Sequence, residues 1–370
     1  MGLTVDGCRQ RQQRVLHSLQ EKNLERLVVS RPEHVQYLSG FRPHHLMASL
    51  ACLDVAGRLT LIAPNRVPEN VAADEILTYE AQWHSTLRPE QQQVAAEQLH
   101  SVLKAGQDVR VGVDGAHIGL DTLKAAGLES LRKAMDFEPE LWQLRRRKDP
   151  DELALMKKAI ACTEAMYVRA REIIEPGIHE LDVFNELQAV AVSTAGEPLS
   201  ALLGNDFQCN SRGGPPRDSR AEAGQLYILD LGPCYRGYFA DNCRTISVDR
   251  QPTQQQLQAW TLIQEVFGLI EREVRPGVHA KRIFEAVDRL LGEFQQGVFP
   301  HHLGHGVGLY PHEAPHLNPY WDDVFEEGDV FTVEPGLYGD ELAHGMRLEN
   351  NYRVTADSVE LLTPFSLELV

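Results

Sequence analysis

The chain has 370 residues, of which 43% are hydrophobic and 24% charged, and its formal net charge is −17. This length leaves room for two domains with sizeable cores, and the ordinary apolar content excludes a disordered chain. The negative charge argues against a nucleic-acid surface. The one notable basic run, residues 145–148, is short and is followed at once by acidic residues, which is typical of a solvated linker.

The six cysteines are scattered and form no CxxC pair, which indicates a reducing compartment. The sequence has no signal-peptide pattern and no apolar run of about 18 residues, and Asp6 replaces the Ser or Thr of a myristoylation site. We therefore expect a cytoplasmic protein without membrane contact.

Residues 1–145 alternate helical and strand patterns, and they predict a small α/β domain without catalytic spacing. The predicted elements are a helix near Gln10–Lys22, buried strands at Leu27–Val29 and Val35–Phe41, a hairpin around Ala56-Gly57 and a strand at Val109–Val113.

A second domain is predicted over residues 150–370. Asp149 and Pro150, with Glu152 three residues after the cap, form a strong helix start. Apolar residues then recur at helical spacing from Leu153 to Tyr167, which predicts a long first helix.

A short repeat follows this helix. Glu175-Pro-Gly-Ile-His179 recurs 100 positions later as Arg275-Pro-Gly-Val-His279, each copy between two helical patterns. The domain could therefore consist of two related α+β halves whose strands form one sheet with a site between them, although so short a match also arises by chance.

Two aspartates in this domain require an explanation. Asp230 follows the apolar run Leu226–Leu229, and Asp241 lies in a second strand-like run. A hairpin centred on Tyr235-Arg236 would place the two carboxylates opposite each other, about 5 Å apart, where they repel unless a cation binds. The alternative is that Asp230 caps a strand and Asp241 lies in a turn.

Three later segments each add one metal-type ligand: His305 in HHLGHGVG, Glu334 in FTVEPGLY and Glu349 in GMRLENNYRV. Four carboxylates and one imidazole are too many for one zinc, and they suit a pair of Mn²⁺ or Co²⁺ ions. We therefore predict a two-metal hydrolytic site. The alternation in the last segment places Arg347 on the face of Glu349, as either a supporting partner or a plain salt bridge.

The letters His312-Glu-Ala-Pro-His316 match HExxH, but Pro315 is incompatible with the helix that this zinc motif needs. We predict an extended loop from which His312 acts as a proton donor or oxyanion partner. The glycines around His305 lack dinucleotide-loop spacing, and we expect them to let the backbone approach the metals. His301 is either structural or part of the site.

Taken together, DLG…ADNCRT, HHLGHGVGLYPHE, TVEPGLY and MRLEN resemble the pita-bread metallopeptidases, the family of Xaa-Pro aminopeptidase, prolidase and creatinase. The resemblance implies an α+β pita-bread catalytic domain behind a creatinase-like N-terminal domain, a homodimer, and two divalent metals. Manganese is preferred, with cobalt, zinc or iron as alternatives.

The resemblance also implies residue roles. Asp230 would bind one metal, Asp241 and Glu349 would bridge both, and His305 with Glu334 would complete the second. Glu334 would also carry protons, and His312 would stabilise the tetrahedral intermediate or assist the leaving amine. His301 and Arg347 would also take part in catalysis, and Tyr338 would contact the substrate.

The chain departs from the family pattern in residues 210–217, which lack the usual substrate-contacting histidine. Arg212 or Arg217 would replace it and favour an anionic substrate. Three functions follow: a peptidase acting on Xaa-Pro bonds of small peptides, a metal-dependent hydrolase or lyase of a small non-peptide metabolite, and a non-enzymatic binding module.

Overall fold

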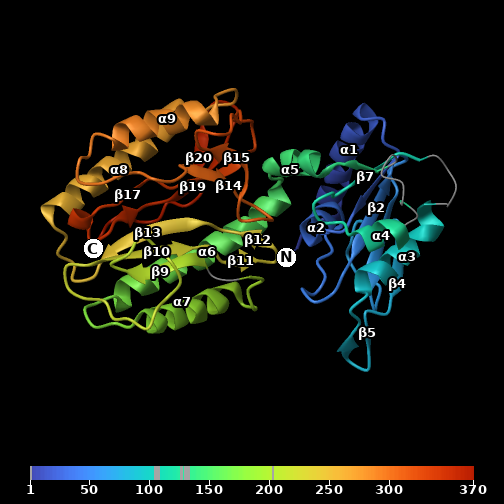
Figure 1. Ribbon diagram of the computed structural model, residues 1–370, viewed down its shortest axis with the longest axis horizontal. Helices are drawn as coiled ribbons and strands as arrows, with labels where there is room; N and C mark the ends of the chain where they lie inside the picture. The colour runs from blue at the N-terminus through green and yellow to red at the C-terminus, as the bar shows by residue number, and fades with distance from the viewer. Residues whose placement is uncertain (1, 104–108, 126–127, 129–133, 202–203) are drawn as a thin grey trace. The chain divides into compact units, whose positions relative to one another are not determined.

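The computed structural model describes residues 2–103, 109–125, 128, 134–201 and 204–370 (Figure 1). The chain divides into two compact units, Met1–Arg145 and Arg146–Val370. Among the helices of the described residues, none is long and apolar enough to cross a membrane.

The first unit is built on a mixed six-stranded sheet with the order β4-β3-β2-β1-β7-β8, in which β1 pairs antiparallel with β2 and parallel with β7. Its elements are α1 (Val5–Glu21), β1 (Arg26–Val29), α2 (Pro32–Ser39), β2 (Leu50–Asp54), β3 (Leu59–Pro64), β4 (Glu75–Tyr79), β5 (Gln82–Trp83), β6 (Thr86–Leu87), α3 (Gln91–Leu103), β7 (Val111–Val113), α4 (Leu120–Ala125), β8 (Ala134–Asp136) and α5 (Glu138–Arg146).

Most predicted elements of this unit are confirmed, including β1, the β2–β3 hairpin and β7. The predicted strand at Val35–Phe41 is wrong, because this segment lies mainly in helix α2. Pro32 occupies the first turn of α2, where its missing N–H is not needed, and Gly40 ends the helix with φ of 76°. Helix α1 begins at Val5, earlier than predicted, because the Thr4 side chain caps it.

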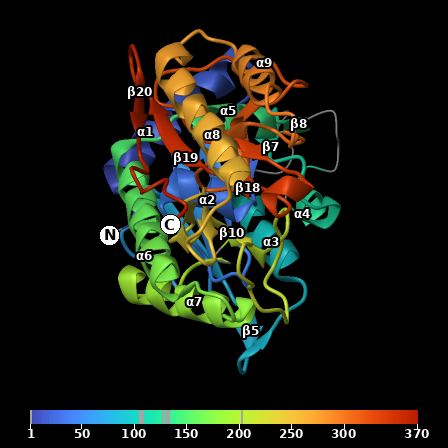
Figure 2. The same ribbon diagram turned by 90° about the vertical axis from the view of Figure 1, so that its left-hand side faces the viewer.

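The second unit contains two helix pairs with strands between them (Figures 1 and 2). The first half holds α6 (Pro150–Ile173), α7 (Glu180–Ala195), β9 (Gly204–Cys209), β10 (Leu226–Leu231), β11 (Cys234–Tyr235), β12 (Tyr238–Phe239) and β13 (Asn242–Ser247). The second half holds α8 (Gln254–Glu273), α9 (Ala280–Leu291), β14 (Gly304–Gly306), β15 (Glu313–Leu317), β16 (Val330–Val333), β17 (Gly336–Leu337), the 3₁₀ helix η1 (Asp340–Leu342), β18 (Met346–Arg347), β19 (Asn350–Val354) and β20 (Val359–Leu361).

The predicted long helix is α6, and the capping box of Asp149 and Glu152 is formed. The short repeat corresponds to a repeated structure. Gly177 and Gly277 each take a left-handed φ, of 96° and 88°, and each donates its N–H to a carbonyl in a later loop of its own half. The two copies therefore make equivalent turns between two helices.

The strands of the two halves form separate sheets, which corrects the expectation of one sheet. One has the order β13-β10-β9 and the other β15-β14-β16-β19-β20. The sheets meet where the backbone N–H of Glu349 donates to the carbonyl of Cys243, at 2.9 Å. Residues of β13 therefore face the loop that precedes β19.

Candidate metal centre

The hairpin that carries the two aspartates has a different register from the predicted one. Asp230 pairs with Cys243, and the turn is centred on Arg236-Gly237. Both turn residues have positive φ, 49° and 93°, as a type I′ turn requires, and this moves the centre one residue along the chain. Asp241 therefore lies diagonally from Asp230, just before β13 begins.

The five predicted ligands nevertheless lie at one place. Asp230 is in β10, His305 is in β14, Glu334 follows β16, and Glu349 precedes β19. Ligand oxygens of Asp230, Asp241 and Glu349 all lie within 4.8 Å of one another. From the other side, His305 Nε2 lies 3.7 Å from an Asp241 oxygen and 3.4 Å from a Glu334 oxygen.

The acidic side chains at this place are buried and incompletely satisfied. Within the described residues, one oxygen of Asp230 and both side-chain oxygens of Glu349 accept no hydrogen bond. Burial, followed by the repulsion of neighbouring carboxylates, holds the pKa of Asp241 and of Glu349 well above its usual range. Orphaned buried acceptors of like charge are the environment that a cation would relieve.

The histidine of the group is oriented as a ligand. His305 Nδ1 lies 3.0 Å from the carbonyl oxygen of Gly306. A carbonyl only accepts, so Nδ1 carries the proton and the lone pair is on Nε2, which faces Asp241 and Glu334. The donor set of one imidazole nitrogen and four carboxylates fits two divalent cations of the manganese or cobalt type.

Two further histidines adjoin this group. His302 Nε2 lies 3.0 Å from Glu334 Oε1. The ring of His312 stacks on that of His305, with 3.8 Å between the ring centres. Burial would raise the pKa of Glu334, but the hydrogen bond from His302 and the proximity of His305 hold it well below its usual range. Burial and the neighbouring histidines lower the pKa of His312 to about 4. His302 was not predicted, and its adjacency to His301 gave no reason to choose it.

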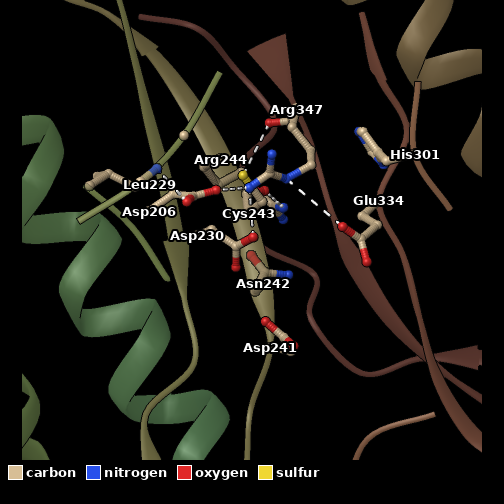
Figure 3. A network of polar contacts seen from close by, with 12 residues as sticks. Asp206, Leu229, Asp230, Asp241, Asn242, Cys243, Arg244, His301, Glu334 and Arg347 are labelled. Atoms are coloured by element: carbon tan, nitrogen blue, oxygen red, sulfur yellow. Dashed lines mark hydrogen bonds and ion pairs between the residues drawn. The ribbon is translucent and has the colours of Figure 1, made fainter. Parts of the chain in front are cut away.

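Arg347 does not pair with Glu349 as predicted; its acidic partners are Asp206, Asp230 and Glu334 (Figure 3). Its guanidinium donates to Asp230 at 2.7 Å, to Asp206, and to the Tyr338 hydroxyl at 2.9 Å. Strand alternation had placed Arg347 and Glu349 on one face, but β18 ends at Arg347, so alternation does not continue to Glu349. Asp206, in β9, was not predicted at all.

His301 is held in one tautomer by two contacts. Its Nδ1 lies 2.8 Å from the carbonyl oxygen of His302, so Nδ1 carries the proton. Its Nε2, 3.0 Å from the Tyr338 hydroxyl, therefore accepts a hydrogen bond from that hydroxyl. The same hydroxyl accepts a hydrogen bond from Arg347. Burial lowers the pKa of His301 to about 4, although the nearby Glu334 carboxylate opposes this shift.

We expected the glycines beside His305 to let the backbone approach the metals, but the space around them indicates a different reason. A Cβ on Gly304 would lie 2.0 Å from the carbonyl oxygen of Thr332, and one on Gly306 2.0 Å from that of Ala314. They permit close packing against β16 and β15. The HExxH letters lie mostly in strand β15, which confirms that they form no zinc-binding helix.

Side chains of the candidate site line a cavity of about 290 Å³. Its lining contains Asp230, Asp241, His301, His302, His305, His312, Glu334, Tyr338, Arg347, Asn205, Asp206, Pro300 and Arg212. Arg217, the alternative to Arg212, instead donates to the buried carboxylate of Glu180 at 2.6 Å.

Comparisons with known proteins agree with this geometry. Residues 154–356 match metallopeptidase family M24, and residues 11–146 match the creatinase/prolidase N-terminal domain. The chain is 25% identical over 371 residues to the Xaa-Pro dipeptidase of Pyrococcus furiosus, covering 98% of this chain and 100% of that protein. The Xaa-Pro dipeptidase of Pyrococcus horikoshii is 24% identical over 370 residues, covering 99% and 100%.

Solved structures show the same fold. The prolidase from P. furiosus has a TM-score of 0.78 at 24% identity, covering 95% of this chain and 99% of that one. The Xaa-Pro dipeptidase from Bacillus anthracis has a TM-score of 0.81 at 21% identity, covering 98% and 99%. The expected α+β architecture is confirmed. The chain belongs to metallopeptidase family M24 and is a hydrolase with a creatinase-type N-terminal domain and a pita-bread catalytic domain.

Proposed function

We propose that this protein is a dinuclear-metal peptidase that hydrolyses the bond before proline in small peptides. The observation that carries the proposal is the convergence of Asp230, Asp241 and Glu349, buried and with orphaned oxygens, on the lone pair of His305. The proline specificity comes from the names of the relatives, which are Xaa-Pro dipeptidases.

In this proposal Asp230, Asp241, His305, Glu334 and Glu349 would together hold the two cations. When bound, the two cations supply an activated water and polarise the scissile carbonyl. Manganese is the preferred metal, with cobalt, zinc or iron as alternatives, and a homodimer is the proposed assembly. Sedimentation that finds only monomer at micromolar concentration would count against the dimer.

The chain's own groups handle the protons. Glu334, kept ionised by its hydrogen bond from His302 and by the neighbouring His305, takes a proton from the attacking water and delivers it to the departing nitrogen. His312, a neutral imidazole, donates a hydrogen bond to the developing oxyanion. His301 has both nitrogens engaged, so we assign it to positioning Tyr338 and Arg347 in place of the catalytic role expected from the sequence.

The test is cleavage of Ala-Pro and Ala-Pro-Ala by metal-stripped protein with and without Mn²⁺, followed by mass spectrometry. Metal-dependent release of alanine from either peptide supports the proposal. If neither is cleaved while the protein still binds metal, the second candidate applies, a hydrolase or lyase of a small anionic metabolite. The specific observation that favours it is the replacement of the family histidine by a segment containing Arg212.

A further inference from the structure

Arg212 is a cation of the active-site cavity that no described residue neutralises. Its guanidinium carbon lies 6.0 Å from the centre of the Tyr338 ring, and it lines the same cavity as the candidate metal ligands. Within the described parts of the chain, Arg212 has no carboxylate partner and donates no hydrogen bond. Arg347, the other arginine of the cavity lining, is already engaged by Asp206 and Asp230.

The Arg212 loop, residues 210–216, is anchored at its base. The Glu180 side chain, which is fully buried, accepts hydrogen bonds from the backbone N–H groups of Cys209 and Arg217, at 3.0 and 2.7 Å. The Arg217 guanidinium closes the base by donating to Glu180 and to the Cys209 carbonyl. A paired buried carboxylate therefore fixes both ends of the loop.

The loop also packs tightly on β9. Gly213 and Gly214 have φ of 130° and 129°, and a Cβ on them would lie 2.4 Å from Asp206 and 2.7 Å from Gln208. Only glycine fits both the conformation and the space. Asp206 further accepts a hydrogen bond from the Gly214 N–H, at 2.5 Å. The backbone beside Arg212 is thus held against the strand that contributes Asp206 to the cavity.

An unpaired guanidinium at the wall of a substrate cavity is suited to bind a carboxylate. The anion that every unmodified peptide carries is its C-terminal carboxylate. The cavity, at about 290 Å³, lies at the lower limit of the roughly 300–1,000 Å³ of drug-sized pockets, so it favours a very short peptide. In a longer peptide the carboxylate lies up to about 3.5 Å further along for each added residue.

We propose that Arg212 binds the C-terminal carboxylate of the substrate and thereby makes the protein a dipeptidase that discriminates against longer or amidated peptides. This inference rests on the proposed peptidase function. In this view Arg212 replaces the substrate-contacting histidine that residues 210–217 lack, and it does so by forming a salt bridge with the C-terminal end of the substrate.

The test compares Ala-Pro with Ala-Pro amide, which differ only in the C-terminal charge, using the full-length Mn²⁺-loaded protein. The wild type is expected to cleave Ala-Pro with the higher kcat/KM. Arg212→Gln is expected to lower kcat/KM for Ala-Pro by about 10- to 100-fold, the value of a charge-assisted hydrogen bond, and to leave the amide unchanged. Arg212→Lys should restore part of the loss. Arg220→Gln is the matched control, because Arg220 is exposed and its guanidinium donates to the Gly177 carbonyl, away from the cavity lining.

Each outcome separates the two proposals. If the wild type cleaves neither compound, the peptidase function itself fails. If the wild type cleaves the amide or Ala-Pro-Ala as well as Ala-Pro, or if Arg212→Gln slows both compounds equally, the peptidase function stands and the carboxylate assignment is overturned. Circular dichroism and thermal unfolding of Arg212→Gln should match the wild type, because no other described side chain depends on Arg212.

Discussion

Asp114 in the N-terminal unit and Glu349 in the catalytic unit are both buried acids, but their hydrogen-bond environments are opposite. In the N-terminal unit, Asp114 is fully buried and accepts hydrogen bonds from the backbone N–H groups of Ser30 and Arg31, at 2.7 and 2.6 Å. In the catalytic unit, both oxygens of the buried Glu349 accept none from the described residues. A buried acid therefore has a structural role at Asp114 and a ligand role in our proposal at Glu349.

The difference shows that burial of an acid is by itself uninformative about function. Burial raises the pKa of Asp114 to about 6 although the N–H groups of Arg31 and Ser30 oppose the rise. Burial also raises the pKa of Glu349, and there the next causes, Asp241 and Asp230, add to it. What distinguishes Glu349 is that no described residue donates a hydrogen bond to its carboxylate and that further carboxylates surround it.

The largest expected effect comes from Asp241→Asn. We expect it to lower Mn²⁺-supported turnover of Ala-Pro by more than about 100-fold, since even residues behind metal ligands are worth 10- to 100-fold. The metal-free variant should be as stable as the wild type or more stable, because an amide removes one of the repelling charges. Turnover assays and urea unfolding of metal-stripped protein check both parts, and unchanged activity would contradict the metal assignment.

Asp114→Ala makes the reverse prediction. It leaves the buried N–H groups of Ser30 and Arg31 without an acceptor, so we expect the N-terminal unit to lose about 1–3 kcal/mol of unfolding free energy. Turnover per folded molecule should remain normal. Urea unfolding followed by hydrogen exchange of the N-terminal unit measures the loss, and equal stability would show that Asp114 is not a structural acceptor.

Tyr338→Phe tests the hydrogen bonds that link Arg347, Tyr338 and His301. We expect a smaller effect, a decrease in kcat of about tenfold. The change removes the hydroxyl that accepts from Arg347 and donates to His301, without changing the ring. The ¹⁵N shifts of His301 should report the Nδ1–H tautomer in the wild type and a changed Nε2 environment in the variant. A wild-type spectrum showing a protonated Nε2 would contradict the assigned direction of the hydrogen bond.

The smallest effect is a pH trend in metal stabilisation. The pKa of Asp241 and of Glu349 is raised in the metal-free protein, so their contribution to stability is fully present at low pH and is lost as the pH rises. Divalent cations bind the ionised form. The rise in Tm on adding Mn²⁺ should therefore be larger at pH 8 than at pH 5.5. Each additional kcal/mol of stabilisation by the metal corresponds to about 2–4 °C in Tm. Calorimetry that finds the same rise at every pH would contradict it.

The sequence predicted the positions of the site residues better than their partners. Carboxylates that close apolar strands, such as Asp230 and Glu334, are visible because strand patterns are local. The hairpin register was missed because it depends on Arg236 adopting a positive φ, which arginine rarely does. The partners of Arg347 were missed because Asp206 is more than a hundred residues away and has no motif of its own.

The N-terminal unit shows the same limit. Residues 35–39 are apolar enough for a buried strand, and the helix was decided by Pro32 at its start and Gly40 at its end. The Pro-Gly repeat, in contrast, predicted a real structural equivalence, because it encodes its turns locally.

The two halves of the catalytic unit divide the proposed ligands between them. Asp230 and Asp241 belong to the first half, whereas His305, Glu334 and Glu349 belong to the second. Neither half alone has the full set. Tight binding of two cations would therefore require both halves to be complete and correctly docked. Metal occupancy would then report whether the two halves have docked correctly, since a truncated or misdocked chain would retain at most a partial set of ligands.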